Sequence, residues 1–374
     1  MFLTFLLLFL PAFLLLLVVS LTVRAFLRPS SSPSPISWAG LALLSFLFLD
    51  GGLLSALPRL GLSFGPVGSG LFYLAVARVG LGLPLLLALL QAARRPRPPA
   101  GRRVLAFFWA LNLALLALEV DAFYIEPFAL QTTYLSLAAP GLSRPLRLVQ
   151  ISDLHLERLT RREEEVLARV EALQPDLIVL TGDYLNLDRL QDPLAQKQAR
   201  EFLSRLHAPL GVYAVSGNVD TPETMHVLFE GLDIVVLEDR VERLPVAGEF
   251  YLVGVSDWGQ ERDAATLRRL MEPLPPEAFT LLLYHTPDLA ETAAAAGVDL
   301  YLAGHTHGGQ VRLPFYGAIV TFSAYGKRYE AGRYPVGPMT LYVSRGIGME
   351  GFWFTPRVRF LCPPELVVVE LEME

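Results

Sequence analysis

The pattern of apolar and polar positions divides the chain into two parts. Up to about Tyr124, long apolar runs are separated by short basic or Pro- and Ser-rich pieces, whereas beyond it charged residues recur every few positions. A bilayer span needs about 20 consecutive apolar residues, and residues 2–23 contain no charged side chain. We therefore predict an all-α transmembrane region over residues 1–124, followed by a separate domain over residues 125–374.

The first part contains four predicted spans, and the arginines between them predict its orientation. The spans are expected at residues 2–23, about 36–57, about 70–91 and 104–118. Arginines gather after the first span and between the third and fourth, and the positive-inside rule places such loops in the cytoplasm. An integral membrane protein with an extracytoplasmic second domain follows. If the fourth segment only lies on the membrane surface, that domain is cytoplasmic.

Two ionisable residues interrupt these spans at similar predicted depth. Asp50 lies in the second span and Arg78 in the third. A lone charge in hydrocarbon is costly and usually has a partner, so one interpretation is an Asp50–Arg78 pair between adjacent helices. The alternative is that Arg78 extends to the interface and that the third span begins later.

The second part alternates short apolar runs with amphipathic stretches, which is typical of an α/β domain. Thr160 and Glu163 form a capping-box pattern that predicts where the first helix begins. Polar residues follow the predicted strands, where α/β folds collect their ligands. These residues are Asp153, His155, Asp183, Asn218, His285, His305 and His307.

The types and order of these residues predict a metal centre. Four of the six histidines of the chain lie at predicted strand ends. A histidine packed in the core is the ordinary interpretation of any one of them, but it does not explain the whole ordered set. Imidazoles and carboxylates are good ligands for Mn, Fe or Zn. The D-x-H and GH-x-H spacings are expected to point both side chains the same way on an extended backbone.

Composition and charge exclude some classes of function. A hydrophobic content of 53% is high for an ordinary soluble protein. The net charge of -6 and the lack of a basic stripe in the second part argue against nucleic-acid binding. The single cysteine, Cys362, cannot form an internal disulfide and is expected to be a buried thiol.

The segments ISDLHL, TGD, SGN, YHTPD and GHTHGGQ together resemble the calcineurin-like metallophosphoesterase superfamily. SAYGKRY, YVSRGIG and CPPELVVVEL extend the likeness to its membrane-associated branch, whose members carry N-terminal spans or export signals. The resemblance implies a four-layer αββα domain, in which two mixed β-sheets pack face to face with helices outside. It also implies two divalent metal ions, Mn, Fe or Zn, at one edge of the sheets.

The resemblance assigns a role to each matching residue. One metal would be bound by Asp153, His155 and His307, the other by Asn218, His285 and His305, with Asp183 bridging them. The two ions would share a hydroxide that attacks phosphorus in line. Arg345, in YVSRG, is expected to bind a phosphoryl oxygen, since a guanidinium suits that geometry. The alternative for Arg345 is a surface ion pair.

One position departs from the family pattern. The superfamily usually has GNH followed by an acid, but here the segment reads Gly217, Asn218, Val219, Asp220. Val219 therefore replaces the usual catalytic histidine, which puts efficient hydrolysis of unactivated alkyl phosphates in doubt. His207 and His226 are the remaining histidines that could substitute, although an ordinary surface role is the simpler interpretation of each.

The sequence favours a hydrolase of phosphoester or pyrophosphate bonds, a phosphodiesterase or pyrophosphatase in type. Its expected partners are the membrane and a phosphorylated substrate, which could be lipid-linked. One alternative is a metal-binding pseudoenzyme or regulatory membrane module, favoured by Val219. Another is a phosphatase of soluble metabolites. UDP-diacylglucosamine pyrophosphohydrolases are relatives that also lack the histidine, but their substrate is cytoplasmic whereas the predicted orientation is extracytoplasmic.

Overall fold

The computed structural model describes residues 102–140, 144–246, 248–351 and 357–373, together with Leu90, Arg94 and Leu142. The chain divides into two compact units. The first comprises Met1–Ile125 and Gly351–Val358, and the second comprises Glu126–Glu350 and Arg359–Glu374. All the described strands belong to the second unit.

Helix α4 (Arg102–Val120) is the main described element of the first unit, and a short π-helix (Asp121–Ile125) continues it. It contains the fourth predicted span, residues 104–118. Within the described part of the chain, no helix is sufficiently long and apolar to cross a membrane. This finding contradicts the prediction of an integral membrane protein. It also contradicts the orientation that was based on four crossings. Asn112 and Glu119 interrupt the apolar run within α4.

The other predictions for the first part of the chain concern residues that the structure does not describe. The first three predicted spans lie outside the described residues. Asp50 and Arg78, the predicted intramembrane pair, also lie outside them.

The second unit contains two six-stranded sheets. The first has the strand order β1-β14-β2-β3-β4-β5. Its strands are β1 (Gln131–Ala138), β14 (Glu365–Glu372), β2 (Leu146–Ile151), β3 (Leu177–Leu180), β4 (Val212–Ala214) and β5 (Val235–Val236). Strands β2 to β5 are mutually parallel, β14 is antiparallel to β2, and β1 is parallel to β14.

The second sheet has the order β12-β13-β9-β8-β7-β6. Its strands are β12 (Gly332–Val336), β13 (Met339–Val343), β9 (Leu300–Ala303), β8 (Phe279–Leu283), β7 (Phe250–Gly254) and β6 (Arg240–Arg243). Its four central strands are parallel, and both edge strands are antiparallel to their neighbours. Both sheets are therefore mixed, as predicted.

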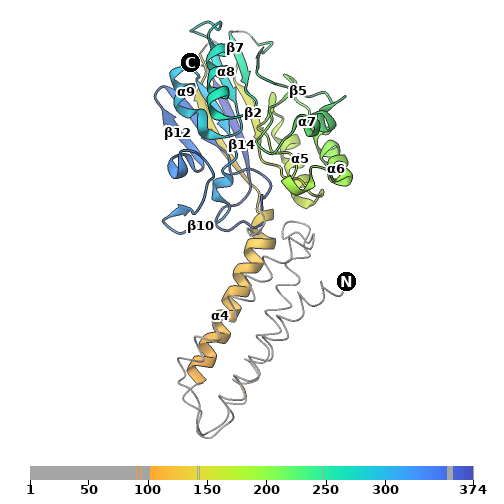
Figure 1. Cartoon of the computed structure of the whole chain (residues 1–374), viewed down its shortest axis with the longest axis vertical. Helices are drawn as coiled ribbons and strands as arrows, with labels where there is room; N and C mark the ends of the chain where they lie inside the picture. The colour runs from red at the N-terminus through yellow and green to blue at the C-terminus, as the bar shows by residue number, and fades with distance from the viewer. Residues whose placement is uncertain are drawn as a thin grey trace. The chain divides into compact units, whose positions relative to one another are not determined.

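Helices cover the outer faces of the two sheets (Figure 1). Helices α5 (Arg161–Leu173), α6 (Pro193–Leu203) and α7 (Pro222–Phe229) share a core with the first sheet. Helices α8 (Gln260–Met271) and α9 (Ala290–Ala295) share a core with the second. A third core is formed by side chains of both sheets between them. The two-sheet, four-layer arrangement predicted from the sequence is confirmed.

Strand β3 shows why the sequences of the central strands are unbroken apolar runs. Leu177 and Val179 point into the core between the sheets, whereas Ile178 and Leu180 point into the core under the helices. Alternate side chains of a strand face opposite sides, so a strand covered on both faces needs apolar residues at every position. The capping box is also confirmed: Thr160 accepts a hydrogen bond at the start of α5, and Glu163 reaches back to the backbone of Thr160.

A small two-stranded hairpin follows the second histidine motif. Its strands are β10 (Arg312–Leu313) and β11 (Gly317–Ala318), paired antiparallel. The short helical turn His307–Gly309 leads directly into it. The hairpin therefore begins within a few residues of the predicted metal ligands.

Candidate metal centre

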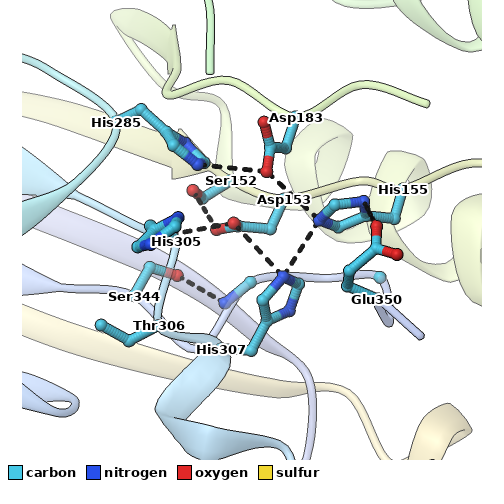
Figure 2. A network of polar contacts seen from close by, with 12 residues as sticks. Ser152, Asp153, His155, Asp183, His285, His305, Thr306, His307, Ser344 and Glu350 are labelled. Atoms are coloured by element: carbon cyan, nitrogen blue, oxygen red, sulfur yellow. Dashed lines mark hydrogen bonds and ion pairs between the residues drawn. The ribbon is translucent and has the colours of Figure 1, made fainter. Parts of the chain in front are cut away.

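The predicted site residues lie just beyond the carboxyl ends of parallel strands from both sheets. Asp153 and His155 follow β2, and Asp183 follows β3. The buried Gln150 ties the two sheets together below the site, because its Nε2 donates to Thr181 Oγ1 (3.0 Å) and to the carbonyl of Ala303 (3.0 Å). The strand ends of the two sheets therefore meet at one place, and the side chains converge there (Figure 2).

Asp153, His155 and His307 form the first cluster, with one potential ligand atom each and all three atoms within 4.8 Å of one another. The Nε2 atoms of His155 and His307 face each other at 3.0 Å. His307 Nε2 lies 3.5 Å from Asp153 Oδ1. Three donor atoms thus point to one small volume (Figure 2).

Asp183, His285 and His305 form the second cluster under the same distance limit. His285 Nε2 lies 3.1 Å from Asp183 Oδ2. Asn218 joins this cluster through its amide oxygen, which lies 3.0 Å from His285 Nε2 and 2.8 Å from His305 Nδ1. The amide oxygen and the two imidazoles therefore converge on a second small volume.

Asp183 lies between the two clusters. Its Oδ2 is 3.1 Å from His285 Nε2 in the second cluster and 3.4 Å from His155 Nε2 in the first. This is the position expected of a carboxylate shared by two ions. The structure thus brings all seven residues together, while their assignment as metal ligands stays a prediction.

The chemistry of the donor set fits divalent cations. Three imidazole or carboxylate donors per cluster match the preferences of Mn, Fe or Zn. The nitrogen atoms of His155 and His307 that face each other need either a proton or a cation between them. Asp153, His155, Asp183, His285 and His307 are all buried, whereas Asn218 is exposed and His305 partly so. The centre is therefore accessible from the side of Asn218 and His305.

Burial and mutual charge shift the pKa values of His307, His285 and Asp183. Burial, reinforced by the neighbouring His155, lowers the pKa of His307 well below its usual value. Burial alone would also lower the pKa of His285, but the Asp183 carboxylate beside it raises that pKa to about 10. The pKa of Asp183 is lowered despite its burial, because His285 and His155 favour its anion. The neighbouring imidazoles thus favour the anionic form of Asp183.

Five of the seven residues adopt a left-handed backbone. The φ angles are 51° for Asp153, 39° for His155, 58° for Asp183, 67° for His305 and 49° for His307. Such residues are uncommon outside glycine and cost roughly 1–3 kcal/mol each, so they persist where the surrounding structure enforces them. The expected extended backbone at D-x-H and GH-x-H is therefore wrong. The backbone turns at each of these five residues, and the turns direct the ligand-type side chains of each motif to a common point.

Two glycines make this close approach possible. A Cβ atom on Gly217 would lie 2.1 Å from Asp183 Oδ1, and one on Gly304 would lie 2.2 Å from Asp153 Oδ2. Both distances are far below van der Waals contact, so any side chain would displace a carboxylate of the centre. The glycines of the SGN and AGH segments are therefore required by packing against Asp183 and Asp153.

Asp220 connects two loops of the centre. Its Oδ2 accepts hydrogen bonds from the backbone N–H groups of Asp183 (2.7 Å) and Gly217 (2.8 Å), and its Oδ1 accepts from Tyr184 (3.1 Å). Burial, together with the charge of Asp183, raises the pKa of Asp220 to about 6. The acid after Asn218 was visible in the sequence, but its role in holding both loops was not.

Glu350 is a site residue that the sequence did not single out. Its Oε2 lies 2.9 Å from His155 Nδ1, on the far side of the ring from the cluster (Figure 2). A carboxylate at Nδ1 keeps the proton there and leaves Nε2 free as a ligand, which orients the ring and raises its basicity. Glu350 is therefore a positioning residue for His155.

We expect Glu350→Gln to weaken metal binding at the first cluster by about 10- to 100-fold, because the neutral amide no longer stabilises the oriented imidazole. Metal affinity can be measured by competition with a chromophoric chelator, with circular dichroism as the check on folding. Glu372→Gln, at the end of β14, is the matched control and should bind metal as the unaltered protein does. An unchanged affinity in Glu350→Gln would show that the contact does not position His155.

Arg345 lies beside the centre but is held by protein partners. Its Nη2 donates to Gln131 Oε1 (3.0 Å) and Glu365 Oε1 (3.2 Å), which matches the ion-pair alternative. Its Nε is buried and has no hydrogen-bond partner among the described residues. The predicted contact with substrate therefore stays a prediction.

Arg359 fixes the loop that contains Arg345. The guanidinium is fully buried and donates to the carbonyl groups of Arg345, Gly346, Gly348 and Cys362. Gly346 in turn packs against Asp153, since a Cβ there would lie 2.6 Å from Asp153 Cβ. Arg359 thereby supports the backbone behind the first cluster. Cys362 is buried with a free thiol, as expected.

The position of the missing histidine lies at the centre, whereas the two other histidines lie on the protein surface. The backbone N–H of the partly buried Val219 donates to Asp183 Oδ1 at 3.2 Å. His226 is exposed on α7 and lies 3.5 Å from Glu230. His207 is exposed and lines a surface pocket with Glu164 and Arg205. Neither histidine is placed to replace the missing one.

The fold consists of two mixed sheets packed face to face. Carboxylate, imidazole and amide groups converge at the carboxyl ends of the strands, in a set that fits two cations. This combination defines a class of dinuclear metal-dependent hydrolases. The family model described as calcineurin-like phosphoesterase matches residues 146–309, which include all seven predicted ligands. The chain belongs to this family. It is a metallophosphoesterase, and enzymes of the family use two divalent metal ions.

Named relatives support this membership. The chain is 34% identical over 263 residues to the uncharacterized metallophosphoesterase YkuE of Bacillus subtilis, covering 67% of this chain and 88% of YkuE. It is 31% identical to the phosphodiesterase YaeI of Escherichia coli, covering 61% and 82%. It is 27% identical to the UDP-2,3-diacylglucosamine pyrophosphatase LpxG of Chlamydia trachomatis, covering 67% and 92%.

Proposed function

We propose that this chain hydrolyses phosphodiester or pyrophosphate bonds at a two-metal centre built from the seven converging residues. Asp153, His155 and His307 would hold one ion and Asn218, His285 and His305 the other, with Asp183 available to both. The observation that carries the proposal is the position of Asp183, whose Oδ2 lies within 3.4 Å of an imidazole nitrogen from each cluster.

When bound, two divalent ions supply Lewis acidity, which lowers the pKa of water and offsets charge on phosphoryl oxygens. The chain contributes the geometry. Buried Asp153 and His307 form the floor of the centre, and the exposed Asn218 marks the side from which a phosphoryl group can enter. Glu350 holds the proton on Nδ1 of His155, and Asp220 fixes the loops of Asp183 and Asn218.

The substrate is proposed to be a diester or pyrophosphate with a lipid-linked group. The printed functions of two relatives support this class, since one is a phosphodiesterase and the other a pyrophosphatase of a diacylated UDP-sugar. Val219 supports the pyrophosphate part of this class, because a site without the usual histidine favours leaving groups that need no proton. A phosphatase of soluble metabolites is the alternative, and a preference for long-chain over short-chain diesters would distinguish the two.

Chelation provides the direct test of the two-metal centre. Exhaustive treatment with a chelator is expected to reduce hydrolysis of bis(4-nitrophenyl) phosphate by at least about a hundredfold, and Mn, Fe or Zn should restore it. Metal analysis of the untreated protein should give about two ions per chain. Full activity in chelator, with the metal content shown to be near zero, would mean that hydrolysis does not use this centre.

A further inference from the structure

An unusual concentration of exposed apolar side chains surrounds the β10–β11 hairpin. We call these residues the hairpin patch: Leu313, Phe315, Tyr316, Ile319, Val320 and Phe322. Phe315 is fully exposed, with a relative exposure of 111%, and Phe322 is 81% exposed. Single exposed apolar residues are normal, but a group of large apolar residues within a short segment marks an interaction surface.

The backbone of the two phenylalanines strengthens this interpretation. The φ angle is 64° at Phe315 and 56° at Phe322, both in the left-handed region. Bulky residues are outliers there, and Gly or Asn would adopt this conformation at lower cost. Neither packing in the fold nor backbone geometry therefore explains why these positions carry phenylalanine.

The base of the hairpin is firmly held, although its tip is exposed. Arg312 donates to the carbonyl of Gly308 (2.9 Å) and to Glu330 Oε1 (2.8 Å). Glu330 Oε2 also accepts from the backbone N–H of Ala318 (3.1 Å). These bonds fix both strands, so the exposed side chains are presented by a defined framework.

The hairpin patch begins at the accessible side of the metal centre. The carbonyl oxygen of Phe322 lies 3.3 Å from Nε2 of His305. The next residue, Ser323, donates to Asp288 at 2.6 Å, and Asp288 follows His285 by three positions. The segment that carries Phe322 thus lies against two of the corners that supply the predicted ligands.

We propose that the hairpin patch binds the hydrocarbon chain of an amphiphilic phosphoester while the phosphoryl group occupies the metal centre. This inference rests on the proposed function, because the centre must receive the phosphoryl group. A single molecule with an anionic end and an apolar end matches the direct continuity between His305 and Phe322. Lys327, whose Nζ lies 3.4 Å from the ring centroid of Tyr316, places a cation at the edge of the patch and suits an anionic amphiphile.

If the hairpin patch binds the hydrocarbon chain, kcat/KM should depend on the length of the alkyl chain of the substrate. Methyl and decyl 4-nitrophenyl phosphodiesters share one leaving group and differ only in the retained alkyl chain. Water adds to phosphorus, the bond to 4-nitrophenolate breaks, and the alkyl phosphate is the second product. Each methylene removed from water is worth roughly fourfold in affinity. The unaltered enzyme should therefore have a higher kcat/KM for the decyl ester than for the methyl ester. The measurement uses concentrations at which the decyl ester is monomeric.

The variants Phe315→Asn and Phe322→Asn test the patch, because Asn tolerates the left-handed backbone while removing apolar surface. In each, the ratio of kcat/KM for the decyl ester to that for the methyl ester should fall by about tenfold, mainly through KM. Leu194→Asn is the matched control, since Leu194 is also exposed but lies on α6. That variant should keep the ratio, and thermal unfolding should show that all three proteins fold.

The outcomes separate this inference from the function on which it rests. An enzyme that hydrolyses neither diester and no pyrophosphate bond contradicts the proposed function itself. Hydrolysis of both with equal kcat/KM, or an unchanged ratio in both Phe variants, contradicts the role of the hairpin patch alone. Loss of binding to phosphatidylglycerol vesicles in the Phe variants, with the ratio for monomeric substrates unchanged, would overturn the inference in favour of a lipid surface.

Discussion

Replacing Asp183 with asparagine is expected to remove nearly all hydrolytic activity, by at least about 10³-fold in kcat/KM, and to reduce the metal content of the protein. Asp183 is the residue shared by the two clusters, with Oδ2 within 3.4 Å of an imidazole in each. An amide has nearly the same size but lacks the negative charge that holds two cations close together. Metal analysis and hydrolysis of bis(4-nitrophenyl) phosphate measure both effects.

Asp233→Asn is the control for Asp183→Asn, because Asp233 is exposed and follows α7 away from the seven-residue cluster. It should retain about two ions per chain and full activity. The glycine-rich loops around Asp183 are tightly packed. Circular dichroism is therefore needed to show that the Asp183 variant remains folded. A folded Asp183→Asn protein with normal metal content and activity would contradict the shared role of this carboxylate.

The fold and the composition of the site could be predicted because both depend on patterns that are local in the sequence. Apolar runs such as residues 177–180 become strands buried on both faces, and Thr160 with Glu163 begins a helix. Parallel strands end at the same edge of a sheet, so residues that follow them, such as Asp153 and Asp183, must lie close together. This argument needs no knowledge of distant contacts.

The features that could not be predicted depend on contacts between distant segments or on backbone strain. Glu350 reaches His155 only because the loop after β13 folds back over the segment that follows β2. The left-handed backbone of His155 and His307 arises from tight packing around them, and their spacing alone suggested an extended chain. The exposed phenylalanines of the hairpin patch carry no motif. Their significance appears only when their exposure and φ angles are known.

The membrane prediction was wrong for a related reason. That prediction rests on runs of apolar side chains, and the fourth predicted span, residues 104–118, is short for a bilayer. In the structure it forms α4, which also contains Arg103 and Glu119. Within the described residues, no helix meets the requirements of length and apolarity for a span.

The absence of the usual histidine should make the enzyme depend strongly on its leaving group. Cleavage of a P–O bond places negative charge on the departing oxygen, and an alkoxide, whose conjugate acid is a very weak acid, needs a proton to leave quickly. General acid catalysis typically contributes about 10²–10⁴-fold. A departing phosphate has a second pKa near 6 and needs little such help. Pyrophosphate and aryl substrates should therefore react much faster than simple alkyl esters.

Val219→His is expected to raise kcat/KM for alkyl phosphoesters by about 10²-fold and that for aryl phosphoesters by less than about tenfold. The position suits an acid, because the backbone N–H of Val219 already bonds to Asp183 Oδ1 (3.2 Å) and its side chain is partly exposed. Val219→Phe adds a ring without a titratable proton and should give no such gain. The measurement is the slope of log kcat/KM against leaving-group pKa, which should become shallower only in the histidine variant. Equal slopes in the unaltered and histidine proteins would mean that another group already supplies the proton, because a site lacking an acid must respond when one is added.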